Sequence, residues 1–213
     1  MIKILNVRNK LSAIFIALLF VVLPFSGSAQ HFIGIKEGMN ISSISFKPVQ
    51  KDSSTHQWFN IGLVYKYYNY PWVGFQTGVN YAEKGFVRDD TTTRYRVVEI
   101  PLLSQFHYEI WHLRFLINMG LYASYALSAE RSYEVSNITV KENYVFTDRD
   151  RRIEYGMHLG AGFGVVFKPF ELQFEGGYQY AFSYMMNPIQ ADQRVIYAHF
   201  QQWIFSVALL VQL

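Results

Sequence analysis

The sequence predicts an all-β protein, an eight-stranded antiparallel up-and-down β-barrel that spans a membrane. In eight segments, apolar or aromatic side chains alternate with polar or small ones, and this period of two is typical of strands. Tight turns and long loops also alternate along the chain, as in an even-numbered meander with both ends on one side. Most glycines fall on the polar faces, which favours a narrow cylinder whose crowded inside is polar.

The clearest strand covers residues 170–184, FELQFEGGYQYAFSY. One face is almost wholly aromatic or aliphatic, and the other carries Glu171, Gln173 and Glu175. Its fifteen residues at about 3.3 Å each would span about 50 Å, which is long for a strand of a soluble domain. An apolar face opposite two glutamates predicts lipid outside and a polar lumen inside.

The same alternation defines the other strands and the connections between them. The expected strands are 32–44, 57–67, 72–84, 96–108, 113–128, 153–167, 170–184 and 201–213. Short turns follow the second, fourth and sixth strands, and the long loops are expected at 46–56, 85–94, 129–152 and 185–198. This asymmetry places the turns in the periplasm and the loops outside the cell. Loop 129–152 is the longest and most charged, so we expect it to be the main contact surface.

One residue departs from the alternation, because Glu37 falls on the apolar side of the first strand. A carboxylate facing lipid is costly at mid-depth. Three explanations are open at this stage. Glu37 lies near a rim, it lies at an oligomer contact, or a bulge shifts its phase.

Charged residues on the polar faces are expected to point into the barrel. They are Lys36, Lys66, Glu99, Arg114, Glu154, Glu171 and Glu175, with Lys84 in the same set. Because unpaired charges in a narrow interior are costly, the expected arrangement is a plug of ion pairs. The functional alternative is a selective pore or a binding pocket.

Aromatic residues gather beside every tight turn. They are Tyr67, Tyr70, Trp72, Tyr108, Trp111, Phe167 and Phe170. Amphipathic rings favour the headgroup zone of a membrane, so these residues predict a periplasmic aromatic girdle. A soluble lipocalin-like barrel is the rival interpretation, and the position of the glycines argues against it.

The N-terminus has the layout of a secretory signal peptide. Basic residues precede an apolar run at 11–25, and small residues follow at 26–29. We therefore expect a signal peptide at 1–29 and a barrel domain at 30–213, with cleavage before Gln30 or before His31. The apolar run is short for a membrane-spanning helix, although a retained N-terminal anchor is an alternative.

Composition excludes several classes of function. The formal charge of +3 comes from 19 basic and 16 acidic residues, and the leader contributes the surplus, so the expected mature chain is neutral. Nucleic-acid binding therefore has no support from charge. The absence of cysteine excludes thiol catalysis, disulfides and thiolate metal sites. We expect no cofactor and no metal.

Candidate catalytic residues are sparse. His107 and His158 could face the lumen, where Glu99 and Glu154 are also expected. His107 lies near the periplasmic turns and His158 nearer the long loops, so no Ser-His-Asp arrangement shares one level. The sequence thus predicts a protein that is not an enzyme, with a rim-sited lipid-modifying enzyme as the less favoured alternative.

Several motifs resemble the PorT-like outer-membrane β-barrel proteins. They are GIKxGxN at 34–40, VEIPLL at 98–103 and ExGY at 175–178, after a leader that ends SAQ. The similarity covers essentially the whole mature chain, although Glu37 replaces a small residue and Leu213 a terminal aromatic. The resemblance implies an outer-membrane barrel, and some members of the family are linked to type IX protein secretion.

The sequence therefore predicts a non-enzymatic protein of the outer membrane with a side-chain-filled polar lumen. It would act through its external loops or as an accessory or structural component of the envelope. The expected partners are outer-membrane lipids, the barrel-assembly machinery and envelope or secretion-system proteins, without nucleic acid. A narrow pore for small solutes is the main alternative.

Overall fold

The computed structural model describes residues 30–47, 56–88, 91–135, 138–146, 150–184, 189–191 and 194–213. Its strands are β1 (Gln30–Lys47), β2 (His56–Tyr68), β3 (Val73–Arg88), β4 (Thr91–Ile110), β5 (Leu113–Val135), β6 (Ile138–Tyr144), β7 (Ile153–Phe167), β8 (Phe170–Ala181), β9 (Ile189–Ala191) and β10 (Arg194–Gln212). The expected signal peptide, residues 1–29, lies outside the described residues. No helix in the described segments is long and apolar enough to cross a membrane.

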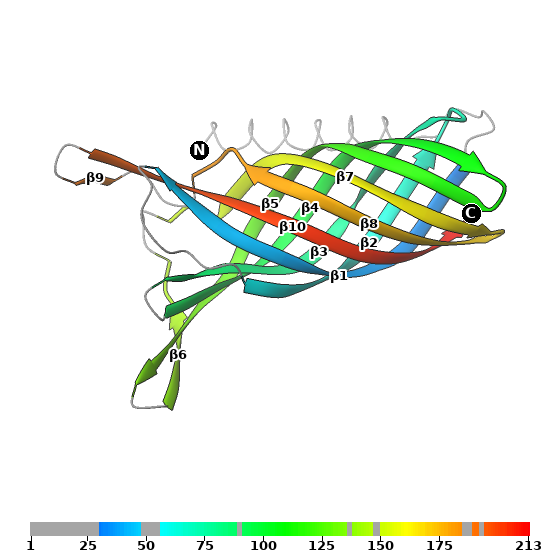
Figure 1. Cartoon of the computed structure of the whole chain (residues 1–213). Helices are drawn as coiled ribbons and strands as arrows, with labels where there is room; N and C mark the ends of the chain where they lie inside the picture. Colours follow the sequence, from blue (N-terminus) through cyan, green and yellow to red (C-terminus); the bar gives the residue numbers. More distant parts are fainter. Residues whose placement is uncertain are drawn as a thin grey trace, which may run out of the picture.

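Eight of these strands close into an antiparallel barrel (Figure 1). Neighbours follow the order β1-β2-β3-β4-β5-β7-β8-β10, and β10 pairs back to β1 from Phe32↔Gln212 to Lys47↔Tyr197. The predicted fold class is confirmed. Closure gives every barrel strand two neighbours, which matters because lipid offers the backbone no hydrogen-bond partner.

The two faces of the barrel wall differ as the alternation predicts. In β4, for example, Leu102 is 53% exposed while its neighbour Leu103 is 1% exposed. The large exposed side chains of the barrel strands are mostly aliphatic or aromatic, whereas buried lysines, glutamates and amides fill the inside. The apolar face is therefore outside and the polar face inside.

Three of the expected loops contain strands instead, and within 185–198 β9 pairs with the beginning of β10. β3 and β4 pair as far as Arg88↔Thr91, which lies within the expected loop 85–94. β5 runs to Val135 and pairs with β6, within the expected loop 129–152. These stretches are rich in Thr, Tyr and Val, which suit strands, but no apolar face marked them as such. The extended β3–β4–β5–β6 segment forms a sheet that projects from the end of the barrel, with β6 farthest out (Figure 1).

The interior also contains two apolar clusters. The sequence predicted a polar lumen and did not predict these clusters. An apolar cluster at the turn end contains Phe32, Val64, Tyr68, Ala208 and Leu210. A second cluster at the loop end contains Ile44, Ala82, Phe86, Tyr95, Val97, Ala126, Ala129, Ala181 and Phe200. Amides such as Gln76 and Asn118 lie between these two clusters. Lys66 and Glu171 are instead paired with Phe32 and Leu210 of the first cluster, and Lys84 with Tyr95 of the second.

Close approach of neighbouring strands makes Gly34 intolerant of a side chain. A Cβ there would collide with the Leu209 carbonyl oxygen and lie 2.8 Å from the Leu210 Cα, both backbone atoms of β10. We predict that Gly34→Ala lowers the free energy of unfolding by about 1–3 kcal/mol. Urea unfolding in lipid vesicles, followed by tryptophan fluorescence, measures this loss.

Gly176→Ala is the matched control, because a Cβ at Gly176 would meet only the Phe205 ring, at 3.5 Å. Its effect should stay within about 0.5 kcal/mol. Equal stability of the two variants would contradict the packing argument.

Candidate functional site

The structure places all seven sequence-predicted lumen residues inside the barrel. They are Lys36 on β1, Lys66 on β2, Glu99 on β4, Arg114 on β5, Glu154 on β7, and Glu171 and Glu175 on β8. They do not converge on one centre. Instead they form separate groups along the barrel, each joined to neighbouring amides or to a further cation.

The group nearest the turns is centred on Arg114 and Glu171. The Arg114 guanidinium binds Glu171 directly and donates from Nη2 to Glu109 Oε2 at 2.8 Å. The Lys66 Nζ lies 3.7 Å from Glu171 Oε1, and the side chains of both residues are completely buried. Two cations therefore face two carboxylates, and the strands that carry Lys66, Arg114 and Glu171 are not neighbours in the barrel wall. The Lys66–Glu171 and Arg114–Glu171 pairs therefore cross the lumen.

Aromatic rings cover this group. The Arg114 guanidinium lies 5.4 Å from the Phe32 ring centre and 5.0 Å from that of Tyr68. The Tyr68 ring in turn lies 4.4 Å from the His107 ring, and its hydroxyl donates to Gln105. The rings form cation–π contacts with Arg114 and make an apolar layer at the turn end of the lumen.

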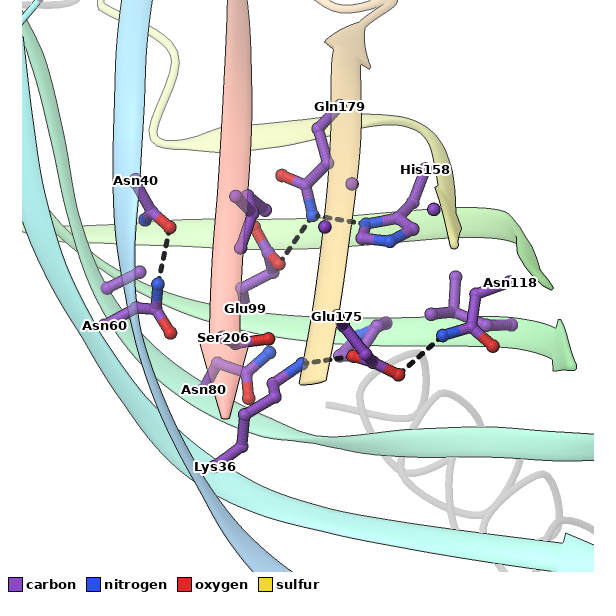
Figure 2. A pocket seen from close by; sticks show the side chains of 17 residues that line it. Lys36, Asn40, Asn60, Asn80, Glu99, Asn118, His158, Glu175, Gln179 and Ser206 are labelled. Carbon is purple, nitrogen blue, oxygen red and sulfur yellow. Dashed lines mark hydrogen bonds and ion pairs between the residues drawn. The ribbon is translucent and has the colours of Figure 1, made fainter. Parts of the chain in front are cut away.

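A ladder of amides crosses the middle of the barrel. Gln105 Nε2 donates to Gln76 Oε1 at 2.8 Å and to Asn118 Oδ1 at 2.7 Å. Asn118 Nδ2 donates to Glu175 Oε1 at 2.6 Å, and the other Glu175 oxygen lies 4.0 Å from Lys36 Nζ. Figure 2 shows Asn118 and Lys36 reaching Glu175 from opposite sides. The ladder links β3, β4, β5, β8 and β1 across the lumen.

Glu99 and His158 meet through an amide nearer the loops. Gln179 Nε2 lies 2.9 Å from Glu99 Oε1 and 3.2 Å from His158 Nδ1 (Figure 2). His107 instead packs against Tyr68 at the turn end. The two histidines thus belong to different groups.

Lys84 forms the last group together with Glu154. Its Nζ lies 2.7 Å from Glu154 Oε1 and donates to Ser124 Oγ at 3.1 Å. The Tyr122 hydroxyl donates to the same Glu154 oxygen at 2.9 Å. The Lys84 Nζ also lies 5.4 Å from the ring centre of Phe200, a member of the apolar cluster at the loop end.

Little empty space remains among these groups. The cavity lined by Lys36, Glu99, His158 and Glu175 holds about 20 Å³. A second cavity of about 20 Å³ adjoins Lys84 and Glu154. Each has room for about one water molecule, whereas small-molecule sites usually measure about 300–1,000 Å³. The described interior is therefore packed with side chains.

Sequence reasoning emphasised charges and missed the share of amides in this packing. Gln76, Gln105, Gln173 and Gln179 are among the largest fully buried side chains. The alternation could have identified these glutamines, since all four lie on the polar face of their strands. Among the described residues, no cluster of three or more His, Cys, Asp or Glu could hold a metal ion.

The residues predicted for the girdle lie on the outer surface at the turn end. Tyr70, Trp72, Tyr108, Trp111, Phe167 and Phe170 are exposed, Trp111 to 85%. Tyr67 is half-buried, and its ring centre lies 5.1 Å from that of His31. The seven residues come from β2, β4, β7, β8 and the adjoining turns.

A cluster of paired charges lies on the outer face of the projecting sheet, where the sheet leaves the barrel. Arg94 lies 2.8 Å from Glu130 and 3.6 Å from Glu83, while Arg96 lies 3.4 Å and 3.6 Å from the same two carboxylates. These residues join β3, β4 and β5 beyond the apolar belt. The cluster thus links the three strands on the outer face.

The outer hairpin, β5–β6, is also ordered by side-chain contacts. The Tyr133 hydroxyl donates to Glu142 Oε1 at 2.7 Å, and this hydrogen bond raises the pKa of the Tyr133 phenol. The Arg131 guanidinium lies 4.3 Å from the Tyr144 ring centre. The predicted contact surface is thus built on a strand pair.

Comparison with known families adds a decisive match. The sequence profile described as "Outer membrane protein beta-barrel domain" matches residues 28–187. The chain belongs to this family. It is accordingly an outer-membrane β-barrel protein. No curated protein sequence matches the chain.

Several solved outer-membrane barrels are similar to the chain, and OprG shares its fold. OprG from Pseudomonas aeruginosa is 10% identical, with a TM-score of 0.56, and the match covers 87% of this chain and 96% of OprG. Neisserial surface protein A is 11% identical, with a TM-score of 0.46 and coverage of 87% and 99%. The protease OmpT from Escherichia coli is 10% identical, with a TM-score of 0.43 and coverage of 90% and 99%. At these identities the likeness concerns the fold alone.

The completely buried Lys66–Glu171 pair generates a stability prediction. We expect Glu171→Leu to lower the free energy of unfolding by about 3–5 kcal/mol, because Lys66 and Arg114 would both lose a buried carboxylate partner. The double variant Lys66→Met with Glu171→Leu should recover part of this loss, since Arg114 retains Glu109. Urea unfolding in lipid vesicles measures both values.

Glu142→Ala, on the exposed hairpin, is the control and should change stability by no more than about 0.5 kcal/mol. A Glu171→Leu variant as stable as the wild-type barrel would show that the buried Lys66–Glu171 pair does not stabilise the folded state.

Proposed function

We propose that this protein is a non-conducting, non-enzymatic barrel of the outer membrane that acts as an accessory or structural component of the envelope. The observation that carries the proposal is the packed lumen. Its charges are joined in pairs across the barrel, and the cavities among them hold about 20 Å³ each. A solute would have to displace these pairs and the apolar layers at both ends.

The projecting sheet is the proposed contact surface. It extends beyond the barrel through β3, β4, β5 and β6, and outward-projecting segments carried on a rigid scaffold commonly provide binding surfaces. Its outermost strand exposes Lys141 and Glu142 to solvent. Charged, exposed side chains of both signs suit a polar protein surface.

The proposed partners follow from the surfaces. Outer-membrane lipids cover the apolar belt, and the barrel-assembly machinery inserts the folded strands. An envelope or secretion-system protein would bind the projecting sheet. The motifs at 34–40, 98–103 and 175–178 resemble PorT-like proteins, and this resemblance supports a link to type IX protein secretion as the finer form of the proposal.

Conductance tests the proposed sealed lumen. Purified protein in planar lipid bilayers should give no discrete ion-conducting steps. A variant that lacks residues 131–144 should be equally silent, because the packed groups lie within the barrel and not in the hairpin. Steps in the wild-type protein would favour a narrow pore, and steps in the deletion variant alone would identify the hairpin as a lid.

Co-purification tests the proposed contact surface. Tagged wild-type protein, extracted from membranes with mild detergent, should retain an envelope partner that the variant lacking residues 131–144 loses. Lys168→Ala, at a tight turn on the opposite end, is the matched control and should retain it. Quantitative mass spectrometry compares the samples, and identical protein sets from all three would contradict a role for the hairpin.

A further inference from the structure

The outer wall of the barrel contains a groove within the lipid-facing belt. It measures about 590 Å³ and lies across β7, β8, β10 and β1. Its floor is formed by the small residues Ala161 and Gly176, which are directly paired on neighbouring strands. The next outward-facing pair towards the turns is Phe163 and Phe174, whose rings stack with centres 5.2 Å apart. A depression therefore adjoins an aromatic ridge.

Glu37 lines the same groove. It is aligned with Val207 on one side and Ile61 on the other, with no shift of register in either ladder. The β1–β2 ladder runs from Gln30↔Tyr68 to Ser42↔His56, so Glu37 lies near its middle. Of the three explanations for this residue, the rim and the bulge are wrong, and an oligomer contact is left.

The Glu37 carboxyl is without a partner among the described residues. It is exposed on the outer face, and no hydrogen bond or ion pair from the described part of the chain reaches it. Between the aromatic girdle and the charge cluster at Glu83 and Arg94, it is the only Asp, Glu, Lys or Arg on the outward face of the described strands. Lipid tails cannot hydrogen-bond it, and a polar group left unpaired in an apolar medium is costly.

We propose that two copies of this barrel associate in the membrane through this groove, with Glu37 of one copy hydrogen-bonded to Glu37 of the other. A second copy brings no lipid-facing cation to the contact, but it brings an identical carboxyl. A protonated carboxyl is both donor and acceptor, so two of them satisfy each other. A two-fold axis beside Glu37 brings the two together, because such an interface uses the same patch on both subunits.

The shape of the groove supports the same occupant. Ala161 and Gly176 project little from the wall, and small residues let membrane-embedded elements approach closely. The adjoining Phe163–Phe174 ridge, together with Phe205, supplies the bulk that a second copy would pack against. One surface therefore carries a depression, a ridge and a self-complementary polar group.

Substitution of Glu37 tests the hydrogen bond. Sedimentation equilibrium of the purified protein in detergent micelles should detect a dimer of the wild-type barrel. Glu37→Leu should raise its dissociation constant about tenfold, whereas Glu37→Gln should retain the dimer because an amide also donates and accepts. Glu37→Leu removes only a polar group from the lipid face, so the variant should fold, which heat-modifiable migration on gels checks.

Cross-linking locates the interface. The chain has no cysteine, so Met39→Cys introduces a unique thiol in the groove, and oxidation in native membranes should yield a disulfide-linked dimer. Leu102→Cys is the control, because Leu102 is exposed on β4, on the far side of the barrel from β10. Its cross-linking should be weak.

Three results would overturn the proposal. The first is a monomer at every concentration, which would leave the groove to lipid chains. The second is a Glu37→Leu dimer as tight as the wild type, or equal cross-linking at Met39→Cys and Leu102→Cys. The third is cross-linking of Met39→Cys only to a different protein, which would assign the groove to another membrane partner.

Discussion

The structure depends on the inability of lipid to hydrogen-bond a peptide group. Each barrel strand must therefore find partners on both sides, which the pairing of β10 with β1 completes. Once the wall is closed, every second side chain meets lipid and every other one meets the lumen. The apolar belt, the polar interior and the glycines packed against neighbouring backbones all follow from this one constraint.

The same constraint explains how far the fold could be predicted from the sequence. Where lipid covers one face, alternation is strict, and the predicted strand at 153–167 has the bounds of β7. Beyond the membrane both faces of a strand meet water, so the signal disappears. Residues 129–135 and 138–144 were accordingly predicted as loop although they form strands. The alternation of polar and apolar residues along a strand predicts that Lys66 and Glu171 point inward. It does not predict that they pair with each other. Their pairing depends on the closure and stagger of the barrel, which bring non-neighbouring strands together across the lumen.

The interior uses charge and amide groups where a soluble protein would use an aliphatic core. Each buried charge costs desolvation, and the ion pairs roughly offset that cost when their hydrogen bonds are complete. Arg114 illustrates how completion is reached, since it binds Glu171, Glu109 and the faces of two rings at once. Such a network fits only one register of the strands around it, because a shift of one residue would turn these side chains towards lipid. The packed lumen therefore helps to specify the register of the barrel strands.

Comparison of Glu175 with Glu37 shows what the two sides of the wall demand of the same side chain. Glu175 lies inside, where Asn118 donates to it and Lys36 provides a counter-charge. Glu37 lies outside, on a ladder that holds it towards lipid, and the described chain offers it nothing. The fold itself supplies the partners of Glu175, so this inward carboxyl needs no explanation beyond stability. An outward carboxyl at mid-depth has no such internal explanation, and the group that satisfies it has to come from a second molecule.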